Sequence, residues 1–207
     1  MKVLLINGSP RQHGCTFTAL SEVANALNLN EIETEIYWIG NKPIAGCISC
    51  RTCAKTGKCS IDDQVNELKL RLSEVDGIVI GSPVYYAGGA GSLIAFLDRL
   101  FYSGATDSLA GKPGAVVVSC RRGGATATFD QLNKFFTISN MPIVPSNYWN
   151  QVHGNTPEET KQDLEGLQTM RVLGGNMAWL IKCIEAGKKQ GIKYASTEQK
   201  IRTNFIR

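Results

Sequence analysis

One stretch decides the fold of this chain: Asn7-Gly8-Ser9-Pro10-Arg11-Gln12-His13-Gly14-Cys15-Thr16-Phe17-Thr18. An apolar, β-branched run over Lys2–Asn7 leads into it, and apolar residues at helical spacing follow over Thr16–Leu27. A glycine-containing turn from strand to helix presents unpaired backbone N–H groups at the positive end of a helix dipole. The stretch therefore predicts a β–α unit with an anion site at its turn.

The side chains of this turn favour a phosphate group. Ser9, Thr16 and Thr18 carry hydroxyl donors, and Arg11 can add charge-assisted hydrogen bonds. The alternative is a tight connection in which Thr16 only caps the helix. The spacing matches neither the Gly-x-Gly-x-x-Gly dinucleotide motif nor a Gly-Lys-Ser/Thr loop, so a mononucleotide phosphate fits better. The candidate cofactor-binding residues of this loop are Ser9, Arg11, Thr16, Phe17 and Thr18.

Outward from this turn, short apolar runs alternate with segments of helical period. Further strands are predicted over Thr34–Ile39, Gly77–Ser82, Gly114–Cys120 and Ile143–Tyr148. Further helices are predicted over Val65–Ser73, Ser92–Phe101 and Thr128–Ile138, with a long last helix or a broken pair over Pro157–Ala186. This alternation predicts an α/β fold of three layers: a doubly wound, five-stranded parallel sheet with helices on both faces. Ligands of such sheets bind beyond the carboxyl ends of the strands, which selects loops 8–16, 83–91 and 120–126.

The second of these loops is suited to a flat aromatic ligand. Pro83 and Val84 favour an extended turn, while Tyr85 and Tyr86 offer broad faces with polar tips. The alternative is that both tyrosines are ordinary packing residues at a strand end. The place of the loop at the predicted switch point favours cofactor binding by all four residues.

The third loop contains Ser119, Arg121, Gly123 and Gly124 as candidate cofactor-binding residues. Its backbone N–H groups can approach the polar edge of a ring, and an arginine can stabilise negative charge there. The alternative is that the arginines are solvated and that the glycines only shape the turn.

Four cysteines, Cys47, Cys50, Cys53 and Cys59, lie within thirteen residues, in an insertion over residues 41–61. Two Cys-x2-Cys steps and a longer return containing Gly57 suit a 4Fe-4S cluster. Nearby basic side chains would offset its negative charge. Zinc and free thiols are the alternatives, although zinc-binding pairs are usually separated by a longer run.

These motifs resemble those of the NADPH-dependent FMN reductase superfamily, which has an Asn-Gly-Ser-x-Arg phosphate loop and a Ser-Pro-x-Tyr segment along the flavin ring. The compact cysteine motif looks like that of the iron-sulfur flavoproteins. The resemblance implies a flavodoxin-like fold, FMN, and Cys47, Cys50, Cys53 and Cys59 as 4Fe-4S ligands. Phe96–Arg99 resembles a family helix ending in Asp-Arg, which we interpret as structural or as an oligomer contact.

The expected function is electron transfer through FMN and a 4Fe-4S cluster, between NAD(P)H or a ferredoxin-like carrier and an acceptor, without a catalytic side chain. One alternative is a cluster-free NAD(P)H-dependent FMN or quinone reductase. Another is a non-enzymatic FMN electron carrier or a zinc-stabilised binding module. Because a short loop shields a cluster poorly, we expect a homodimer or homotetramer.

Composition limits the other possibilities. With 207 residues and 43% apolar content, we expect one domain over 1–186 and a basic C-terminal tail over 187–207. The tail has six basic side chains and one acidic one, but no basic face with interleaved aromatics favours nucleic acid. No apolar run is long enough to span a membrane. Seven cysteines without a secretory signal predict a reducing, cytoplasmic location.

Overall fold

A parallel sheet organises the chain in the computed structural model, which describes residues 1–194, 198, 201 and 203. Its strands lie in the order β2-β1-β3-β5-β6, and a short strand, β4, pairs antiparallel with β3. β1 lies between β2 and β3: Ile6 pairs with Tyr37 of β2 on one side and with Ile80 of β3 on the other. The strand bounds are β1 (Lys2–Asn7), β2 (Glu33–Trp38), β3 (Gly77–Tyr85), β4 (Gly88–Gly89), β5 (Gly114–Cys120) and β6 (Gln151–His153).

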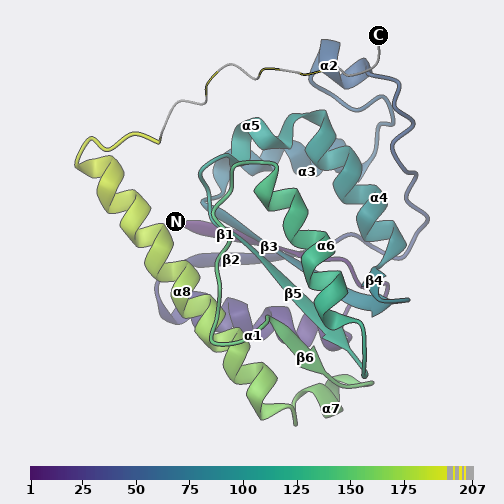
Figure 1. The fold of residues 1–207 in the computed structure, drawn as a ribbon, viewed down its shortest axis with the longest axis vertical. Coiled ribbons are helices and arrows are strands. Elements are labelled where there is room, and N and C mark those ends of the chain that lie inside the picture. Colours follow the sequence, from purple (N-terminus) through teal and green to yellow (C-terminus); the bar gives the residue numbers. More distant parts are fainter. Residues whose placement is uncertain (195–197, 199–200, 202, 204–207) are drawn as a thin grey trace.

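Helices cover both faces of the sheet (Figure 1). On each face, the apolar sides of the helices and of the sheet form one hydrophobic core. α1 (Cys15–Leu29) and α8 (Leu164–Lys189) cover one face, and α3 (Gln64–Arg71), α4 (Gly91–Leu100) and α6 (Ala125–Thr137) cover the other. The α1–α8 contact is close because Gly174 has no side chain: a Cβ there would lie 2.6 Å from Ala26 Cβ and 2.8 Å from the Val23 carbonyl oxygen. The three-layer α/β prediction is confirmed.

Shorter elements complete the chain. They are α2 (Thr52–Thr56), the 3-10 turn η1 (Leu72–Glu74), the π-helical turn η2 (Phe101–Ala105), α5 (Thr106–Leu109) and α7 (Pro157–Thr160). α7 and α8 are the broken pair anticipated for the last helical segment. α8 continues to Lys189, three residues into the predicted basic tail, much of which lies outside the described residues.

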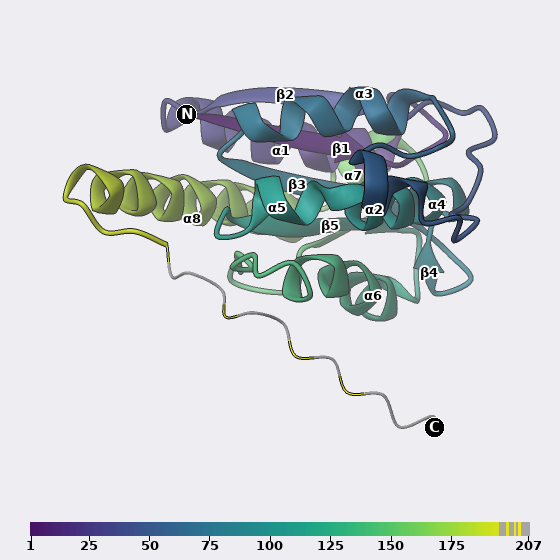
Figure 2. The ribbon, with the colours of Figure 1, turned by 90° about the horizontal axis from the view of Figure 1, so that it is seen from above.

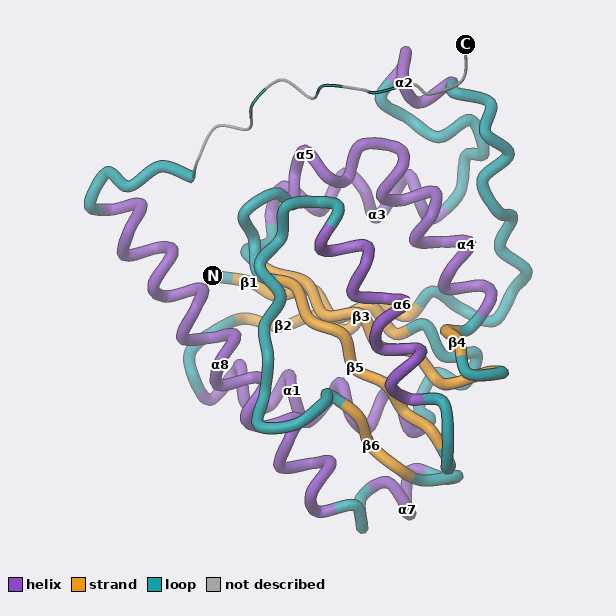
Figure 3. Tube along the Cα trace, viewed as in Figure 1, coloured by secondary structure: helices purple, strands orange, loops and turns teal. Residues whose placement is uncertain are grey.

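The predicted strand over Ile143–Tyr148 is wrong. Ile143 makes one isolated bridge to Gly114, and the segment then runs as a loop to β6 (Figure 3). Pro142 and Pro145 flank the bridge and have no N–H to donate to a ladder, so the apolar run cannot continue as a strand. The fifth parallel strand is Gln151–His153, paired with Val118–Cys120.

The cysteine-containing insertion leaves the sheet after β2. Residues 39–51 form a long loop along the outside of the molecule, drawn in teal in Figure 3. α2 then lies over η2, beyond the carboxyl end of α4 (Figures 1 and 2). The insertion therefore packs on the helices of one face and not on the sheet.

Within the described part of the chain, every helix is too short or too polar to cross a membrane.

Candidate functional site

The turn after β1 is held in shape by its own hydrogen bonds. The buried Asn7 accepts from Ser9 N–H at 3.1 Å and donates to the Gln12 carbonyl at 2.9 Å. Ser9 Oγ accepts from Arg11 N–H at 3.1 Å, and the Trp38 indole donates to the Ser9 carbonyl at 2.7 Å. Because these side chains already bond the backbone of the turn, its geometry exists before any ligand arrives.

The helix after this turn starts without a side-chain cap. Gly14 is the N-cap of α1, and no described side chain accepts from the first turn. A Cβ on Gly14 would lie 3.1 Å from Arg11 Cβ, so the glycine keeps this approach open. Uncapped N–H groups at a helix start are the donors that an anion needs.

Thr16 joins two loops instead of capping the helix, so the capping alternative is wrong. It lies inside α1, and its hydroxyl is 2.7 Å from the hydroxyl of Ser119 at the end of β5. Both residues are buried. The pair fixes the first loop against the third.

The second loop is a two-residue hairpin between β3 and β4. Its central residues, Tyr86 and Ala87, have φ of 50° and 58°, the left-handed region that favours glycine in such turns. Ser82 Oγ accepts from Ala90 N–H at 3.1 Å and so fixes the far side of the hairpin. Tyr85 is half exposed, and Tyr86 is fully exposed at the tip.

A fourth loop, after β6, closes the site. Gly154 N–H donates to the Cys120 carbonyl at 3.2 Å, and the Cys15 thiol approaches the Gly154 carbonyl at 3.7 Å. Cys120 Sγ lies 3.4 Å from His153 Nδ1. Burial raises the pKa of the Cys120 thiol, so this group stays protonated at neutral pH.

These four loops surround one cavity at the carboxyl ends of β1, β3, β5 and β6. We call it the flavin cavity. Eight of the predicted cofactor-binding residues line it: Ser9, Arg11, Thr16, Pro83, Val84, Tyr85, Ser119 and Arg121. It lies beside the β1–β3 switch point, where ligands of doubly wound sheets bind. The uncapped helix start, Arg11 and the broad Tyr85 side chain fit a phosphate-bearing flavin.

Five predicted residues lie outside this lining. Thr18 donates back to the Gly14 carbonyl, and Phe17 packs edge-on against His13. Tyr86 points into solvent, and Gly123 is exposed. Gly124, at φ +93°, caps α6, where a Cβ would lie 2.8 Å from Ala87 Cα; it lets the hairpin pack closely.

The four cysteines of the insertion line a second, small cavity, which we call the cysteine cavity. Cys47, Cys50, Cys53 and Cys59 all face it, together with Arg99 and Tyr102 from the end of α4 and η2. Ser49 and Arg51 have φ of 54° and 58°, so the loop turns sharply between the cysteines. Within the described chain, no three His, Cys, Asp or Glu side chains converge tightly enough for a single metal ion.

Comparison with known proteins adds the family. The model of the NADPH-dependent FMN reductase family matches residues 1–156, which include the phosphate-loop turn, the cysteines and the hairpin. The chain belongs to the NADPH-dependent FMN reductase family. Membership identifies it as an FMN-dependent oxidoreductase.

Similar proteins include iron-sulfur flavoproteins. One from Methanocaldococcus jannaschii is 37% identical over 192 residues, covering 89% of this chain and all of that protein. One from Methanosarcina thermophila is 26% identical over 191 residues, covering 91% of this chain and 99% of that protein. Among solved structures, RosB with bound 8-demethyl-8-formylriboflavin-5′-phosphate has a TM-score of 0.71 at 16% identity, covering 100% of this chain and 94% of that one. An archaeal flavodoxin, at a TM-score of 0.59 and 16% identity over 88% of this chain and 99% of that one, shows the same fold.

Sequence reasoning missed part of the flavin cavity of this family member. Gly154 and Asn155 line it, and they follow β6, the strand whose position was predicted wrongly. Cys15 and Cys120 also line it, and neither is among the predicted cofactor-binding residues. The signal available was the short run Gln151–His153 before a glycine, which is too brief to stand out from sequence alone.

Arg99 has the structural role, one of the two that the Asp-Arg likeness left open. Its side chain is buried, and it bonds within the chain to Asp63 and to residues of the insertion. The sequence carries no signal that a residue of α4 reaches a loop about forty positions earlier.

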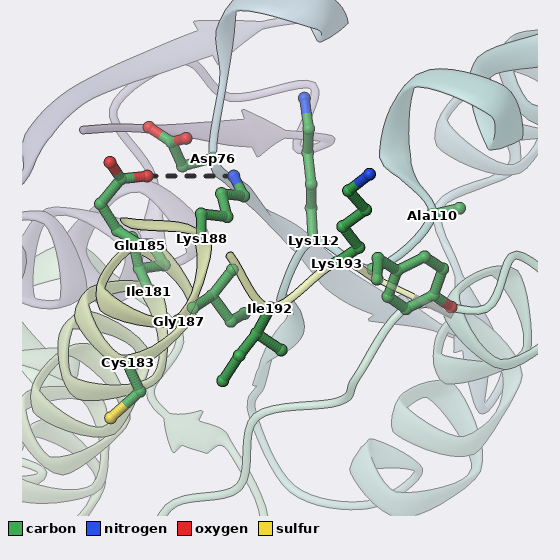
Figure 4. Close-up of a pocket in the computed structure, with 13 residues that line it drawn as sticks. Asp76, Ala110, Lys112, Ile181, Cys183, Glu185, Gly187, Lys188, Ile192 and Lys193 are labelled. Carbon is green, nitrogen blue, oxygen red and sulfur yellow. Dashed lines mark ion pairs between the residues drawn. The ribbon is translucent and has the colours of Figure 1, made fainter. Parts of the chain in front are cut away.

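A larger cavity lies at the opposite end of the sheet, between the end of α8 and the turn before β5 (Figure 4). It has a volume of about 530 Å³, with isoleucine walls and three lysines, of which Lys188 pairs with Glu185. Asp76 and Lys112 place it at the amino ends of β3 and β5. Ligands of this fold bind at the other end, so we assign this cavity no role.

Proposed function

We propose that the protein is an oxidoreductase that holds FMN in the flavin cavity and a 4Fe-4S cluster in the cysteine cavity. Its donor is NAD(P)H or a ferredoxin-like carrier, and electrons pass on to a small-molecule or protein acceptor. The single observation that carries the proposal is that four cysteines line one cavity in a chain whose switch point forms a second cavity at an uncapped helix start. The iron-sulfur flavoproteins among the similar proteins support it.

The flavin side is built from backbone donors and fixed loops. The start of α1 and Arg11 would hold the phosphate, and the Pro83–Tyr85 segment would lie along the ring. When bound, FMN supplies exchange between two-electron and one-electron partners. The chain contributes binding and orientation, and the Thr16–Ser119 pair keeps two walls in register.

The cysteine side has the donor set of a cluster. Thiolates from Cys47, Cys50, Cys53 and Cys59 would hold it, because four cysteine sulfurs are the usual ligands of 4Fe-4S centres. Arg51 lines this cavity, and Lys55 and Lys58 are exposed on the same insertion, so their positive charges would offset that of a cluster. A ferredoxin-like acidic carrier would find a complementary charge on the insertion.

The two cavities lie on different parts of the chain, which favours a homo-oligomer. α4 starts beside the hairpin and ends at the cysteine cavity, and its ten residues span about 15 Å. No described residue lines both cavities. The flavin cavity, at about 200 Å³, is smaller than pockets that enclose a cofactor alone, at roughly 300–1,000 Å³. A second copy that covers both openings would complete the pocket and bring a flavin to the cluster.

The test compares wild-type protein with Cys53→Ser, both purified without oxygen and loaded with FMN. NADPH or NADH is the donor, and either benzoquinone or benzyl viologen is the acceptor. We expect wild type to reduce both acceptors and Cys53→Ser to keep quinone reduction while losing most viologen reduction.

Equal viologen rates in the two proteins would establish a cluster-free FMN or quinone reductase instead. If dithionite reduces the bound flavin reversibly but NAD(P)H does not, two interpretations remain. The protein either takes electrons from another donor, such as a ferredoxin-like carrier, or is a non-enzymatic electron carrier. Because Cys53 is remote from the flavin cavity, the retained quinone rate also serves as the folding control.

A further inference from the structure

Arg99 is a buried cation at the base of the cysteine cavity. It stands on α4, with 1% of its surface exposed. Its guanidinium donates to both carboxylate oxygens of Asp63, at 2.7 and 2.8 Å, and to the Ile61 carbonyl at 2.9 Å. A fourth N–H donates to the Ala45 carbonyl at 3.4 Å, and the fifth, on Nε, points to Cys59 Sγ at 3.3 Å. One arginine therefore joins α4, the start of α3 and a candidate cluster ligand.

Cys59 is held more firmly than the other three cysteines. Asn66 Oδ1 accepts from Cys59 N–H at 2.9 Å, and Asn66 Nδ2 donates to the Cys59 carbonyl at 3.1 Å. Cys47 and Cys50 are exposed, and the Cys50 thiol lies 3.2 Å from the hydroxyl of the exposed Ser60. The Cys53 thiol reaches only the Tyr102 carbonyl, at 3.8 Å, among the bonds of its described side chain. The arginine thus acts on the one cysteine whose backbone is already fixed from both sides.

An arginine N–H to a cysteine sulfur stabilises negative charge on that sulfur. Such charge-assisted bonds are about twice as strong as neutral ones. The potential of an iron-sulfur centre depends on net charge, on hydrogen bonds to the sulfurs and on burial. Arg99 affects all three, while Asp63 opposes it with a negative charge at the same place.

We propose that Arg99 is a positioning residue that raises the reduction potential of the cluster through its N–H bond to Cys59, and that Asp63 offsets part of this effect. The inference rests on the proposed function, since it requires that Cys59 ligates a cluster. Reduction adds an electron to the cluster, so a nearby cation and an N–H···S bond stabilise the reduced form. Removing Arg99 lowers the potential, and neutralising Asp63 raises it.

The test uses the full chain, purified without oxygen, with the cluster potential measured by titration followed by electron paramagnetic resonance. Arg99→Gln loses the charge and the N–H on sulfur. We expect its potential to fall by at least about 59 mV, a tenfold change in the one-electron equilibrium constant. Arg71→Gln is the matched control, because Arg71 pairs with Glu35 on β2 and does not line the cysteine cavity; its potential should not move.

Asp63→Asn keeps the shape and the α3 cap of Asp63, whose Oδ1 accepts from Val65 N–H. We expect its potential to rise, opposite in sign to Arg99→Gln. If Arg99→Gln fails to hold iron, the potential of Asp63→Asn decides the question: a rise supports the inference, and a fall contradicts it. A wild-type protein without iron would overturn the proposed function. A wild-type cluster whose potential is unchanged in Asp63→Asn, and in Arg99→Gln where that variant holds iron, would overturn this inference alone.

Discussion

The flavin cavity and the cysteine cavity are held by different means. The first lies where loops leave four core strands, and its shape comes from backbone turns and the buried Thr16–Ser119 pair. The second lies in an insertion outside the helices, and its shape comes from a few polar side chains of α3 and α4. Damage to one cavity should therefore leave the other intact, and single substitutions should act most strongly on the insertion.

The largest expected effect is loss of the cluster in Cys59→Ser. With one of four thiolate ligands removed, iron should fall from about four to less than one per FMN. FMN content should stay at the wild-type value, because Cys59 does not line the flavin cavity. Iron and flavin assays on one preparation measure both. Cys183→Ser, an exposed cysteine of α8, is the control, and equal iron loss there would contradict the assignment.

The next effect is on the flavin side. Thr16→Val removes a hydroxyl and leaves that of Ser119 buried without its partner, which costs about 1–3 kcal/mol of the free energy of unfolding. FMN affinity should also fall. Denaturant unfolding and fluorescence titration with FMN measure the two changes. Iron content should not change, and a parallel loss of iron would break the separation of the two cavities.

Acid should weaken the insertion through Asp63. Burial raises the pKa of this carboxyl, but hydrogen bonds from Arg99 and Val65 N–H outweigh burial and hold the pKa below its usual 3.8. A lowered folded-state pKa stabilises the fold above pH 3.8, and this contribution is lost as the pH falls through the folded value.

The measurement is the difference in free energy of unfolding between metal-free wild type and Asp63→Asn. It should be about 1 kcal/mol near pH 6, after discounting for the partial exposure of Asp63, and should shrink below pH 3.8. A difference that grows in acid has the wrong sign for this interpretation.

The smallest effect concerns the surface pair Lys58–Asp62, at 3.0 Å and largely exposed. Lys58→Met should change the free energy of unfolding by less than about 0.5 kcal/mol, because solvent screens exposed pairs. Thermal unfolding of the metal-free wild type and variant measures this difference. If Lys58→Met lowered the free energy of unfolding as much as Asp63→Asn does, the exposed Lys58–Asp62 pair would stabilise the insertion as strongly as the Arg99–Asp63 pair. That result would contradict the role given to Arg99.

The sequence predicted the surroundings of the flavin cavity better than those of the cysteine cavity. β1 and β5 have the predicted bounds because their apolar, β-branched runs are buried on both faces. The segment over Ile143–Tyr148 begins with two β-branched residues, yet Pro145 prevents a ladder, and the error hid the Gly154–Asn155 loop. Local pattern was sufficient for the turns beside core strands.

Long-range side-chain contacts could not be predicted from the sequence. The cysteine spacing indicated a metal-binding loop, but nothing local shows that Arg99 reaches Cys59 forty residues away. The Thr16–Ser119 pair spans more than a hundred residues and depends on the relative placement of β1 and β5 around β3. Such contacts follow from the topology, so they became visible only with the fold.

The proposed function requires two cofactors in one chain, and their stoichiometry tests this most directly. Iron, acid-labile sulfide and FMN are measured on wild-type protein purified without oxygen, with an absorption spectrum alongside. We expect about four irons and four sulfides per FMN. FMN with neither iron nor sulfide would contradict the proposed function, and would identify the chain as a cluster-free flavin or quinone reductase.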